Sequence, residues 1–415
     1  MHVKEVFNPG GRPGVTYNPR KQLELEKKFK DYLSGSNKFL EVTGPTKSGK
    51  TVLCHRMVKD IKHIWIEGQD IQEENDFWNK IIYSLGLYTN LSREKSSEEH
   101  QILSSDVRGK VSAIFSGLSG GVQGEQGVKK ADGSTQSRTD EPKFVALEAI
   151  SEQKQPIIID DFHYVPPYLQ LTILRSLKKI IYNGIGVVLV SVPHKAYDTV
   201  RLQADFEGRV QSLKIPKWEV NELNEIANQG FKSLNIISDE FVNEKLAEEC
   251  FGNPQLMHEF CAYICRINHI EEQLPYRKKF KKTPNNSFFE DIACEITTPV
   301  HFDLLRNIES QKINVKDREG NSISLPQAIL QSLANTGPKE NISYTDFEIV
   351  LKRVIAGEIP SYSDVSQVLS EMQQKCRSSP GNPYLFEWDS NAKKFYLMDP
   401  YFSLFMRWQI REKVL

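Results

Sequence analysis

The chain has 415 residues, a formal net charge of −1 at pH 7 and a hydrophobic fraction of 39%. These values exclude a wholly disordered chain and fit a soluble globular protein of about two or three domains. The balanced charge excludes a global attraction to nucleic acid or to an anionic membrane, so such a contact would need a local patch. Residues 1–18 hold no apolar signal segment, and no run of about 18 apolar residues occurs, so we expect a cytoplasmic protein without membrane contact.

The first 20 residues are rich in proline and glycine and predict an irregular arm, followed by a helix over Arg20–Leu33. The motif GPTKSGKT at residues 44–51, a phosphate-loop pattern, follows this helix, and in nucleotide-binding ATPases an arm and helix in this place often cover the adenine base. Tyr17 and Arg20 are the candidates for this contact. The alternative is an arm that lies on the surface.

A short apolar run, Phe39–Val42, leads into GPTKSGKT. The pattern G-x-x-x-x-G-K-[ST] between a strand and a helix start is that of a phosphate-binding loop. Its glycines let backbone N–H groups point at phosphate oxygens, and the following helix adds the positive end of its dipole. Lys50 would bind the β- and γ-phosphates, and the Thr51 hydroxyl would bind Mg²⁺. The predicted nucleotide-binding residues here are Gly44, Pro45, Thr46, Lys47, Ser48, Gly49, Lys50, Thr51 and Val52.

Strands and helices alternate after the loop. His63–Glu67 predicts the second strand and Asp76–Leu87 a helix. Residues 92–139 are polar and then glycine-rich, and predict an insertion with a β-hairpin.

Two carboxylates follow the next strand. Ile157–Ile159 is a β-branched run without alternation, which is typical of a strand buried on both faces, and Asp160 and Asp161 come at its carboxyl end. Asp160 would hold Mg²⁺, and Asp161 would orient the attacking water. An aspartate in place of a glutamate at this position predicts slow turnover.

Two further candidates face the phosphates from other strands. Gly186–Val192 predicts another buried strand, and Ser191 at its end would sense the γ-phosphate. Arg209 precedes the last short strand and would reach the phosphates of its own or a neighbouring subunit, with Arg201 as an alternative. An ordinary surface salt bridge is the other interpretation of Arg209.

Three helices follow the sheet, over Glu219–Ser233, Ser238–Cys250 and Pro254–Asn268, with Asn221 and Ser238 as predicted caps. Gly252 ends the second helix and Pro254 opens the third, whose N-terminus can aim at the nucleotide.

The remaining chain divides in two. Residues 271–287 contain RKKFKK and predict a basic linker, either solvated or in contact with nucleic acid or an acidic partner. Helices and then a closing hairpin, including a helix over Phe302–Ile308, predict a winged helix in residues 288–415. The predicted domains are a P-loop sheet domain over 1–216, a helical lid over 217–270, the linker over 271–287 and the winged-helix domain over 288–415.

Together these landmarks resemble the STAND branch of the AAA+ ATPases, which is allied to origin-recognition initiators and archaeal winged-helix ATPases. The matching stretches are GPTKSGKT, IIIDDFH, FEGRV, the lid turn GNPQLM and the ending DPYFSLFMRW. The resemblance implies an α/β fold: an AAA+ (ASCE) parallel sheet with a helical lid and a C-terminal winged helix.

The resemblance also implies a switch. ATP held by Lys50, Thr51 and Asp160, and sensed by the turn at Pro254, would control self-association. Bacterial members are frequent in antiphage defence. Typical members carry a fused effector and a repeat sensor, which this sequence lacks, so we expect a separate effector or sensor protein as partner.

The resulting hypothesis is a Mg-ATP-binding switch ATPase with slow hydrolysis, whose cofactors are ATP and Mg²⁺. The alternative is a DNA-binding AAA+ initiator or loader that uses the winged helix and the basic linker. A third interpretation is an ATP-bound adaptor without turnover.

Overall fold

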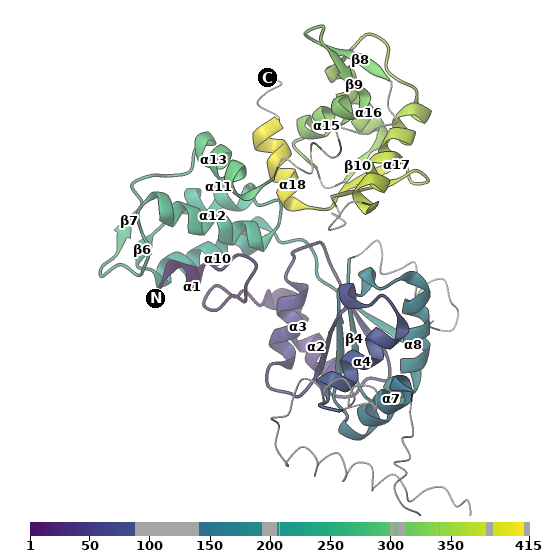
Figure 1. Cartoon of the computed structure of the whole chain (residues 1–415). Helices are drawn as coiled ribbons and strands as arrows, with labels where there is room; N and C mark the ends of the chain where they lie inside the picture. The colour runs from purple at the N-terminus through teal and green to yellow at the C-terminus, as the bar shows by residue number, and fades with distance from the viewer. Residues whose placement is uncertain are drawn as a thin grey trace, which may run out of the picture. The chain divides into compact units, whose positions relative to one another are not determined.

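The computed structural model describes residues 1–87, 141–192, 206, 208–298, 303, 305, 313–339, 341–378 and 385–410 (Figure 1). Two compact units divide the chain. Unit 1 comprises Met1–Leu23, Pro45–Gly49 and Pro216–Leu415, and unit 2 comprises Glu24–Gly44 and Lys50–Ile215. Among the described helices, none has both the length and the apolar character that crossing a membrane requires. The predicted hairpin in residues 92–139, Arg201 and most of the predicted helix Phe302–Ile308 lie outside the described residues.

The described strands of unit 2 form one parallel sheet in the order β2-β3-β4-β1-β5. The strands are β1 (Phe39–Thr43), β2 (Ile64–Glu67), β3 (Ile157–Asp160), β4 (Val187–Ser191) and β5 (Val210–Lys214). β4 therefore lies between β1, which leads into the glycine loop, and β3, which leads into the acid pair. Since all strands run the same way, the residues that follow β1, β3 and β4 emerge at one edge of the sheet.

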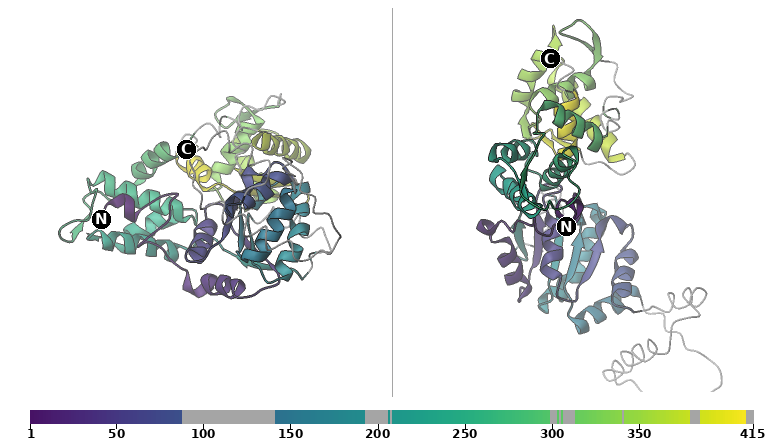
Figure 2. Two further views of the ribbon diagram at one scale, coloured as in Figure 1. Left: turned by 60° about the horizontal axis from the view of Figure 1, so that its bottom comes forward. Right: turned by 90° about the vertical axis from the view of Figure 1, so that its left-hand side faces the viewer.

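Apolar runs in the sequence explain why the middle strands of the sheet are buried on both faces. Every residue of β1, β3 and β4 is buried, as expected for strands covered on both faces. α4 (Glu74–Ser84), α7 (Pro142–Gln153) and α8 (Pro167–Tyr182) pack together over one face, and α2 (Leu25–Leu33) and α3 (Lys50–Val58) lie over the other (Figures 1 and 2). The predicted strand Gly186–Val192 is confirmed as β4.

The predicted helix Arg20–Leu33 is wrong at its start. A single 3-10 turn, Lys21–Leu23, precedes α2, and Arg20 and Glu24 adopt left-handed backbone angles with φ of 48° and 52°. Left-handed residues interrupt the hydrogen-bond ladder of a right-handed helix, so α2 begins only at Leu25. The arm is not irregular throughout either, because Val3–Val6 forms the short helix α1.

In unit 1, the lid consists of α10 (Val220–Ser233), α11 (Glu240–Glu248) and α12 (Pro254–Ile267). α1 and the unpredicted helix α13 (Asn286–Ile296) contribute to the same apolar core. The predicted caps are one or two residues off: Glu219 caps α10 through a reciprocal contact with Glu222, and Asp239 precedes α11. β6 (Ile236–Ile237) and β7 (Lys278–Lys279) pair in parallel beside the lid.

In the C-terminal part of unit 1, helices precede a β-hairpin. α15 (Leu325–Asn335), β10 (Asn341–Ser343), α16 (Tyr344–Val354) and α17 (Tyr362–Ser378) precede the hairpin of β12 (Phe386–Asp389) and β13 (Lys394–Leu397). β13 lies between β10 and β12 in an antiparallel sheet. Short strands β8 (Asn314–Asp317), β9 (Ser322–Ser324) and β11 (Ile355–Ala356) form a second small sheet.

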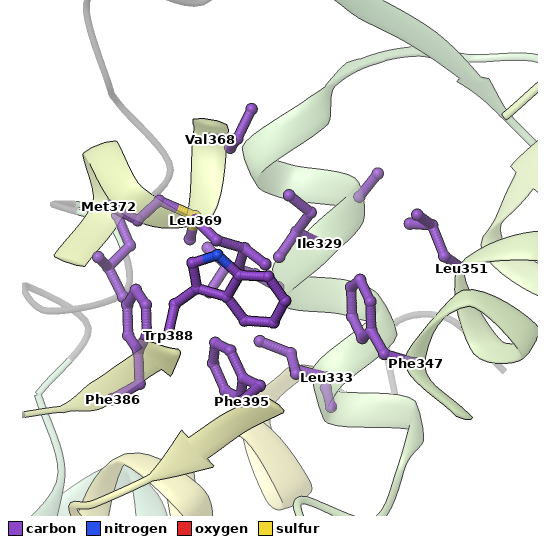
Figure 3. Packing of buried hydrophobic residues seen from close by; sticks show 14 of the residues in the cluster. Ile329, Leu333, Phe347, Leu351, Val368, Leu369, Met372, Phe386, Trp388 and Phe395 are labelled. Atoms are coloured by element: carbon purple, nitrogen blue, oxygen red, sulfur yellow. The ribbon is translucent and has the colours of Figure 1, made fainter. Parts of the chain in front are cut away.

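Aromatic side chains of the hairpin fill the core under these helices. Trp388 of β12 and Phe395 of β13 point at Ile329 and Leu333 of α15 (Figure 3). Trp388 is 6% exposed, and its indole N–H donates to the Ser366 hydroxyl at 3.0 Å, so the polar atom of this buried ring is satisfied.

The last described helix returns to the lid. α18 (Pro400–Phe405) continues into a π-helical turn, Met406–Ile410. Leu404 belongs to the lid core, and the Trp408 ring stacks on Phe289 at 5.1 Å. Arg407 and Trp408 both donate to the Glu249 carboxylate, at 2.6 and 3.0 Å.

Candidate nucleotide-binding site

The glycine loop has the backbone conformation that its sequence predicts. Gly49 has φ of 95°, a left-handed value that suits glycine, and no atom would crowd a Cβ there. The requirement for glycine is therefore conformational. α3 begins at Lys50, directly after this turn, so the loop is followed by the positive end of a helix dipole.

Lys50 lies inside the loop that precedes it. Its Nζ donates to the Gly44 carbonyl at 2.9 Å, and the residue is 7% exposed. Burial lowers the pKa of Lys50 to about 8, against the opposing effects of the Asp161 and Asp160 carboxylates. A desolvated ammonium group held beside acids attracts further anionic oxygens strongly, because little water competes for it.

Asp160 and Asp161 differ in environment although they are adjacent. Asp160 is 3% exposed and accepts a hydrogen bond from the Thr51 side chain; burial raises its pKa, and this hydrogen bond opposes the rise. Asp161 has left-handed backbone angles with φ of 50°, and its N–H donates to Asp160 Oδ1 at 3.0 Å. Burial and the neighbouring Asp160 charge raise the pKa of Asp161 to about 6. Asp160 is thus the inner carboxylate, hydrogen-bonded to Thr51, and Asp161 is the less buried carboxylate beside it.

Two residues at the end of β2, Glu67 and Gly68, lie close to the acid pair. The sequence analysis did not predict either of them. A Cβ on Gly68 would come within 2.4 Å of the Asp161 carbonyl oxygen, so only glycine fits there. The Glu67 carboxylate, held by the Trp65 indole N–H at 2.7 Å, also raises the pKa of Asp161. The rule that ligands bind at the carboxyl ends of parallel strands would have selected Glu67.

Ser191 ends β4 directly beside Thr43, the last residue of β1. It is 2% exposed, and its hydroxyl has no hydrogen-bond partner among the described residues. A buried polar atom without a partner is rare and calls for an explanation. Its place on the strand between the loop and the acid pair is the one that the sensor prediction requires.

Arg209 lies at the opposite edge of the sheet. Its carbonyl accepts the N–H of Phe39, the first residue of β1, whereas the glycine loop follows the last residue of β1. Four residue steps of strand separate the two ends, about 13 Å. A role for Arg209 at phosphates therefore stays a prediction, and it would concern a neighbouring subunit.

In unit 1, the lid turn contacts the tip of the glycine loop. Asn253 caps α12 through its Oδ1, and its Nδ2 donates to the carbonyls of Lys47 at 3.2 Å and Thr46 at 3.4 Å. Pro254 occupies the first turn of α12. The Trp218 indole N–H donates to the Ser48 carbonyl at 2.9 Å. The prediction singled out Pro254, but the polar contacts come from Asn253 and Trp218.

The Lys47 side chain points to the C-terminal helix. Its Nζ lies 2.8 Å from Asp399 Oδ2 and 4.2 Å from the centre of the Tyr401 ring. Asp399 also caps α18 by accepting the N–H of Phe402. Lys47 therefore binds a carboxylate of its own chain.

The arm is held by a buried ion pair, so Arg20 is not available to cover a base. Arg20 is 3% exposed, binds Glu222 Oε2 at 2.6 Å and donates to the carbonyls of Pro216 and Lys217. Its guanidinium group lies 4.8 Å from the centre of the Trp218 ring. Tyr17, which is half-buried, keeps its predicted role as an untested candidate.

Replacing Arg20 by alanine is expected to destabilise unit 1 by about 3–5 kcal/mol, because Glu222 would remain as a buried charge without its partner. Chemical denaturation followed by tryptophan fluorescence measures this loss, since Trp218 lies against Arg20.

The double variant Arg20→Met/Glu222→Leu is the control for this prediction. It removes both charges and is expected to lose clearly less stability than the single variant. Equal losses would show that the ion pair does not account for the effect.

Comparison with solved structures identifies the fold. No protein-family model matches the chain, and no curated protein matches it. Among solved structures, a Walker-type ATPase of Pyrococcus abyssi is similar with a TM-score of 0.52 and 12% identity, over 92% of this chain and 95% of that one. The ORC2 protein of Aeropyrum pernix is similar with a TM-score of 0.51 and 13% identity, over 99% and 97%.

The chain has the AAA+ P-loop fold. The similarity to both of these structures extends along nearly the whole of each chain. A STAND protein with a tetratricopeptide repeat sensor, from Pyrococcus horikoshii, is also similar with a TM-score of 0.35 and 15% identity. The match covers 90% of this chain and 47% of that protein.

The residues present fit the nucleotide and the Mg²⁺ that AAA+ P-loop proteins use. Thr51 and Asp160 supply a hydroxyl and a carboxylate, which are the oxygen ligands that Mg²⁺ prefers. Ser48 is 3% exposed, and its hydroxyl, like that of Ser191, lacks a partner among the described residues. Lys50 is the buried cation that phosphate oxygens require in such a loop.

Proposed function

We propose that the chain is a Mg-ATP-binding switch ATPase that hydrolyses ATP slowly and changes its assembly state or partner contacts between nucleotide forms. The observation that carries this proposal is the gathering of Lys50, Thr51, Asp160 and Ser191 at one edge of the sheet. In P-loop ATPases this edge binds the β- and γ-phosphates and Mg²⁺. The similar ORC2 protein of Aeropyrum pernix was solved in ADPNP and ADP complexes.

Each of these residues has a role in the proposal. Lys50 binds the β- and γ-phosphates, Thr51 and Asp160 hold Mg²⁺, Asp161 orients the attacking water, and Ser191 senses the γ-phosphate. Mg²⁺ neutralises charge on the phosphates when it is bound. The aspartate at position 161 is shorter than the usual glutamate, which supports slow turnover. A separate effector or sensor protein and a role in antiphage defence rest on the family resemblance alone.

The second candidate, a DNA-binding initiator or loader, is supported by the winged-helix order of α15, β10, α16, α17, β12 and β13. Winged helices also serve as protein contacts, so this order does not decide between the two candidates.

Light-scattering mass of the ligand-free, ADP-Mg and ATP-Mg forms, with and without duplex DNA, tests the two candidates. A mass that grows with ATP alone supports the self-assembling switch. A monomer that assembles only when duplex DNA is present supports the loader. A mass that is constant under all these conditions contradicts both.

A further inference from the structure

The tip of the glycine loop, Pro45–Gly49, belongs to unit 1. The carbonyls of residues 46–48 accept hydrogen bonds from the side chains of Asn253 and Trp218 of this unit. A peptide carbonyl and the N–H that follows it point in opposite directions, because the peptide unit is planar and trans. These bonds therefore turn the N–H side of the loop peptides away from their lid donors, as a loop that binds phosphate through N–H groups requires.

Lys47 differs from its neighbours in the loop because its backbone is left-handed. Its φ is 59°, in the region that glycine adopts freely and that a residue with a Cβ atom avoids. Left-handed residues in such a loop curve successive N–H groups around an anion. Strained backbone of this kind persists where surrounding contacts hold it, and it is concentrated at ligand-binding sites. The contacts of the Lys47 side chain are therefore candidates for what stabilises this conformation.

Asp399 supplies a charged contact to Lys47. Its Oδ2 lies 2.8 Å from Lys47 Nζ, and the Asp399 and Lys47 side chains are 19% and 32% exposed. Its Oδ1 accepts the N–H of Phe402 at 2.8 Å and thereby caps α18. One oxygen thus anchors the carboxylate to a helix while the other binds the loop lysine, so the carboxylate has a fixed position beside the ammonium group.

Tyr401 adds a second contact to the same ammonium group. The centre of its ring lies 4.2 Å from Lys47 Nζ, a distance typical of a cation–π interaction. The Tyr401 hydroxyl donates to Glu259 Oε1 at 3.4 Å, which orients the ring from α12. Both contacts come from the stretch DPYFSLFMRW, for which the nucleotide site alone gives no role.

We propose that Asp399, together with Tyr401, is a positioning residue of the nucleotide site. By binding the Lys47 side chain, it holds the loop in the left-handed conformation that phosphate binding needs. This role deepens the proposed function and rests on it, because it concerns nucleotide binding by the same loop. It links the loop to a residue 352 positions later in the chain, and it requires no contact between Asp399 and the nucleotide.

Two other roles of the pair have different consequences. If the Lys47 ammonium group bound phosphate directly, Asp399 would compete for it, and loss of the carboxylate would tighten ATP binding. If the pair only fastened α18, ATP binding would not change. The contacts favour the positioning role, because both groups that bind the ammonium are themselves fixed, Asp399 by its cap and Tyr401 by Glu259.

Titration calorimetry of the full chain with ATP-Mg tests the proposal. Asp399→Asn removes the charge but keeps the cap, because asparagine caps helices about as well as aspartate does. It is expected to weaken ATP binding about tenfold, which is the effect of losing a hydrogen bond between charged groups. The matched control, Asp346→Asn, removes the same charge from an exposed position in the first turn of α16 and is expected to leave ATP affinity unchanged.

Two substitutions of Lys47 separate backbone positioning from direct phosphate binding. Lys47→Gln keeps a Cβ atom but loses the charge, so the left-handed conformation loses its support and about tenfold weaker binding is expected. Lys47→Gly also loses the charge but adopts positive φ freely, so it is expected to bind ATP about threefold more tightly than Lys47→Gln. Equal losses in these two variants, or tighter ATP binding by Asp399→Asn, would overturn the proposal.

Hydrogen exchange without nucleotide separates this test from that of the proposed function. In the ligand-free chain, the peptide spanning residues 44–51 is expected to exchange about tenfold faster in Asp399→Asn and Lys47→Gln than in the wild type or Asp346→Asn. Thermal melts verify that each variant is folded. No ATP binding by the wild-type chain would contradict the proposed function. Unchanged exchange in Asp399→Asn would overturn the positioning role even when ATP binds.

Discussion

Lys50→Ala is expected to weaken ATP binding at least 100-fold, which is about 2.7 kcal/mol. The substitution removes the buried ammonium group that donates to the Gly44 carbonyl and that we propose binds the phosphates. Titration calorimetry with ATP-Mg measures the loss.

The fold is expected to survive this substitution, because burial already disfavours the charged form of Lys50 and alanine removes that cost. A thermal melt verifies it. Lys62→Ala, which removes an exposed lysine shortly after α3, is the matched control and is expected to bind ATP normally. Retained affinity in Lys50→Ala would contradict the assignment of the loop.

Asp161→Asn is expected to lower the rate of ATP hydrolysis by about 10²–10⁴-fold while ATP affinity changes less than threefold. An amide cannot accept the proton of the attacking water, but it has nearly the same size as the carboxylate and leaves Lys50, Thr51 and Asp160 in place. Phosphate release under saturating ATP, together with the binding titration, separates the two effects.

The matched control for this variant is Asp60→Asn, an exposed aspartate of unit 2, for which normal turnover is expected. Wild-type turnover in Asp161→Asn would remove Asp161 from the mechanism. No turnover in the wild-type chain would instead favour an ATP-bound adaptor.

The sheet could be predicted from the sequence because its signals are local. Uninterrupted apolar runs, as in Ile157–Ile159, have few alternatives to a strand buried on both faces, and the glycine loop has a fixed spacing. Because the strands are parallel, the residues at their carboxyl ends lie at the same edge of the sheet as the glycine loop, and these residues can be selected from the sequence. Ser191 was predicted as a site residue in this way, and the same rule would also have selected Glu67.

The features that the sequence did not predict share a physical cause: each depends on contacts with residues that are distant in the sequence. Arg20 breaks a helix that its neighbours favour, and it is held by Glu222 and the carbonyls of Pro216 and Lys217. The cap position of Asn253 is visible locally, but its second contact, to the loop carbonyls, is not. β7 has no apolar alternation at all, because a single ring, Phe280, anchors it.

The packing of α18 against the lid affects how the chain folds during synthesis and which truncated fragments can fold. Leu404, Tyr401 and Trp408 pack with lid residues that precede them by more than a hundred positions, so a ribosome releases the lid helices well before their core can close. During that interval the apolar side of α12 and α13 is exposed, and a chaperone would have its clearest target there. For the same reason, a fragment shortened to the sheet and lid would carry an uncovered apolar surface. A fragment that keeps residues 400–410, joined to α13 by a short linker in place of the residues between them, would cover this surface.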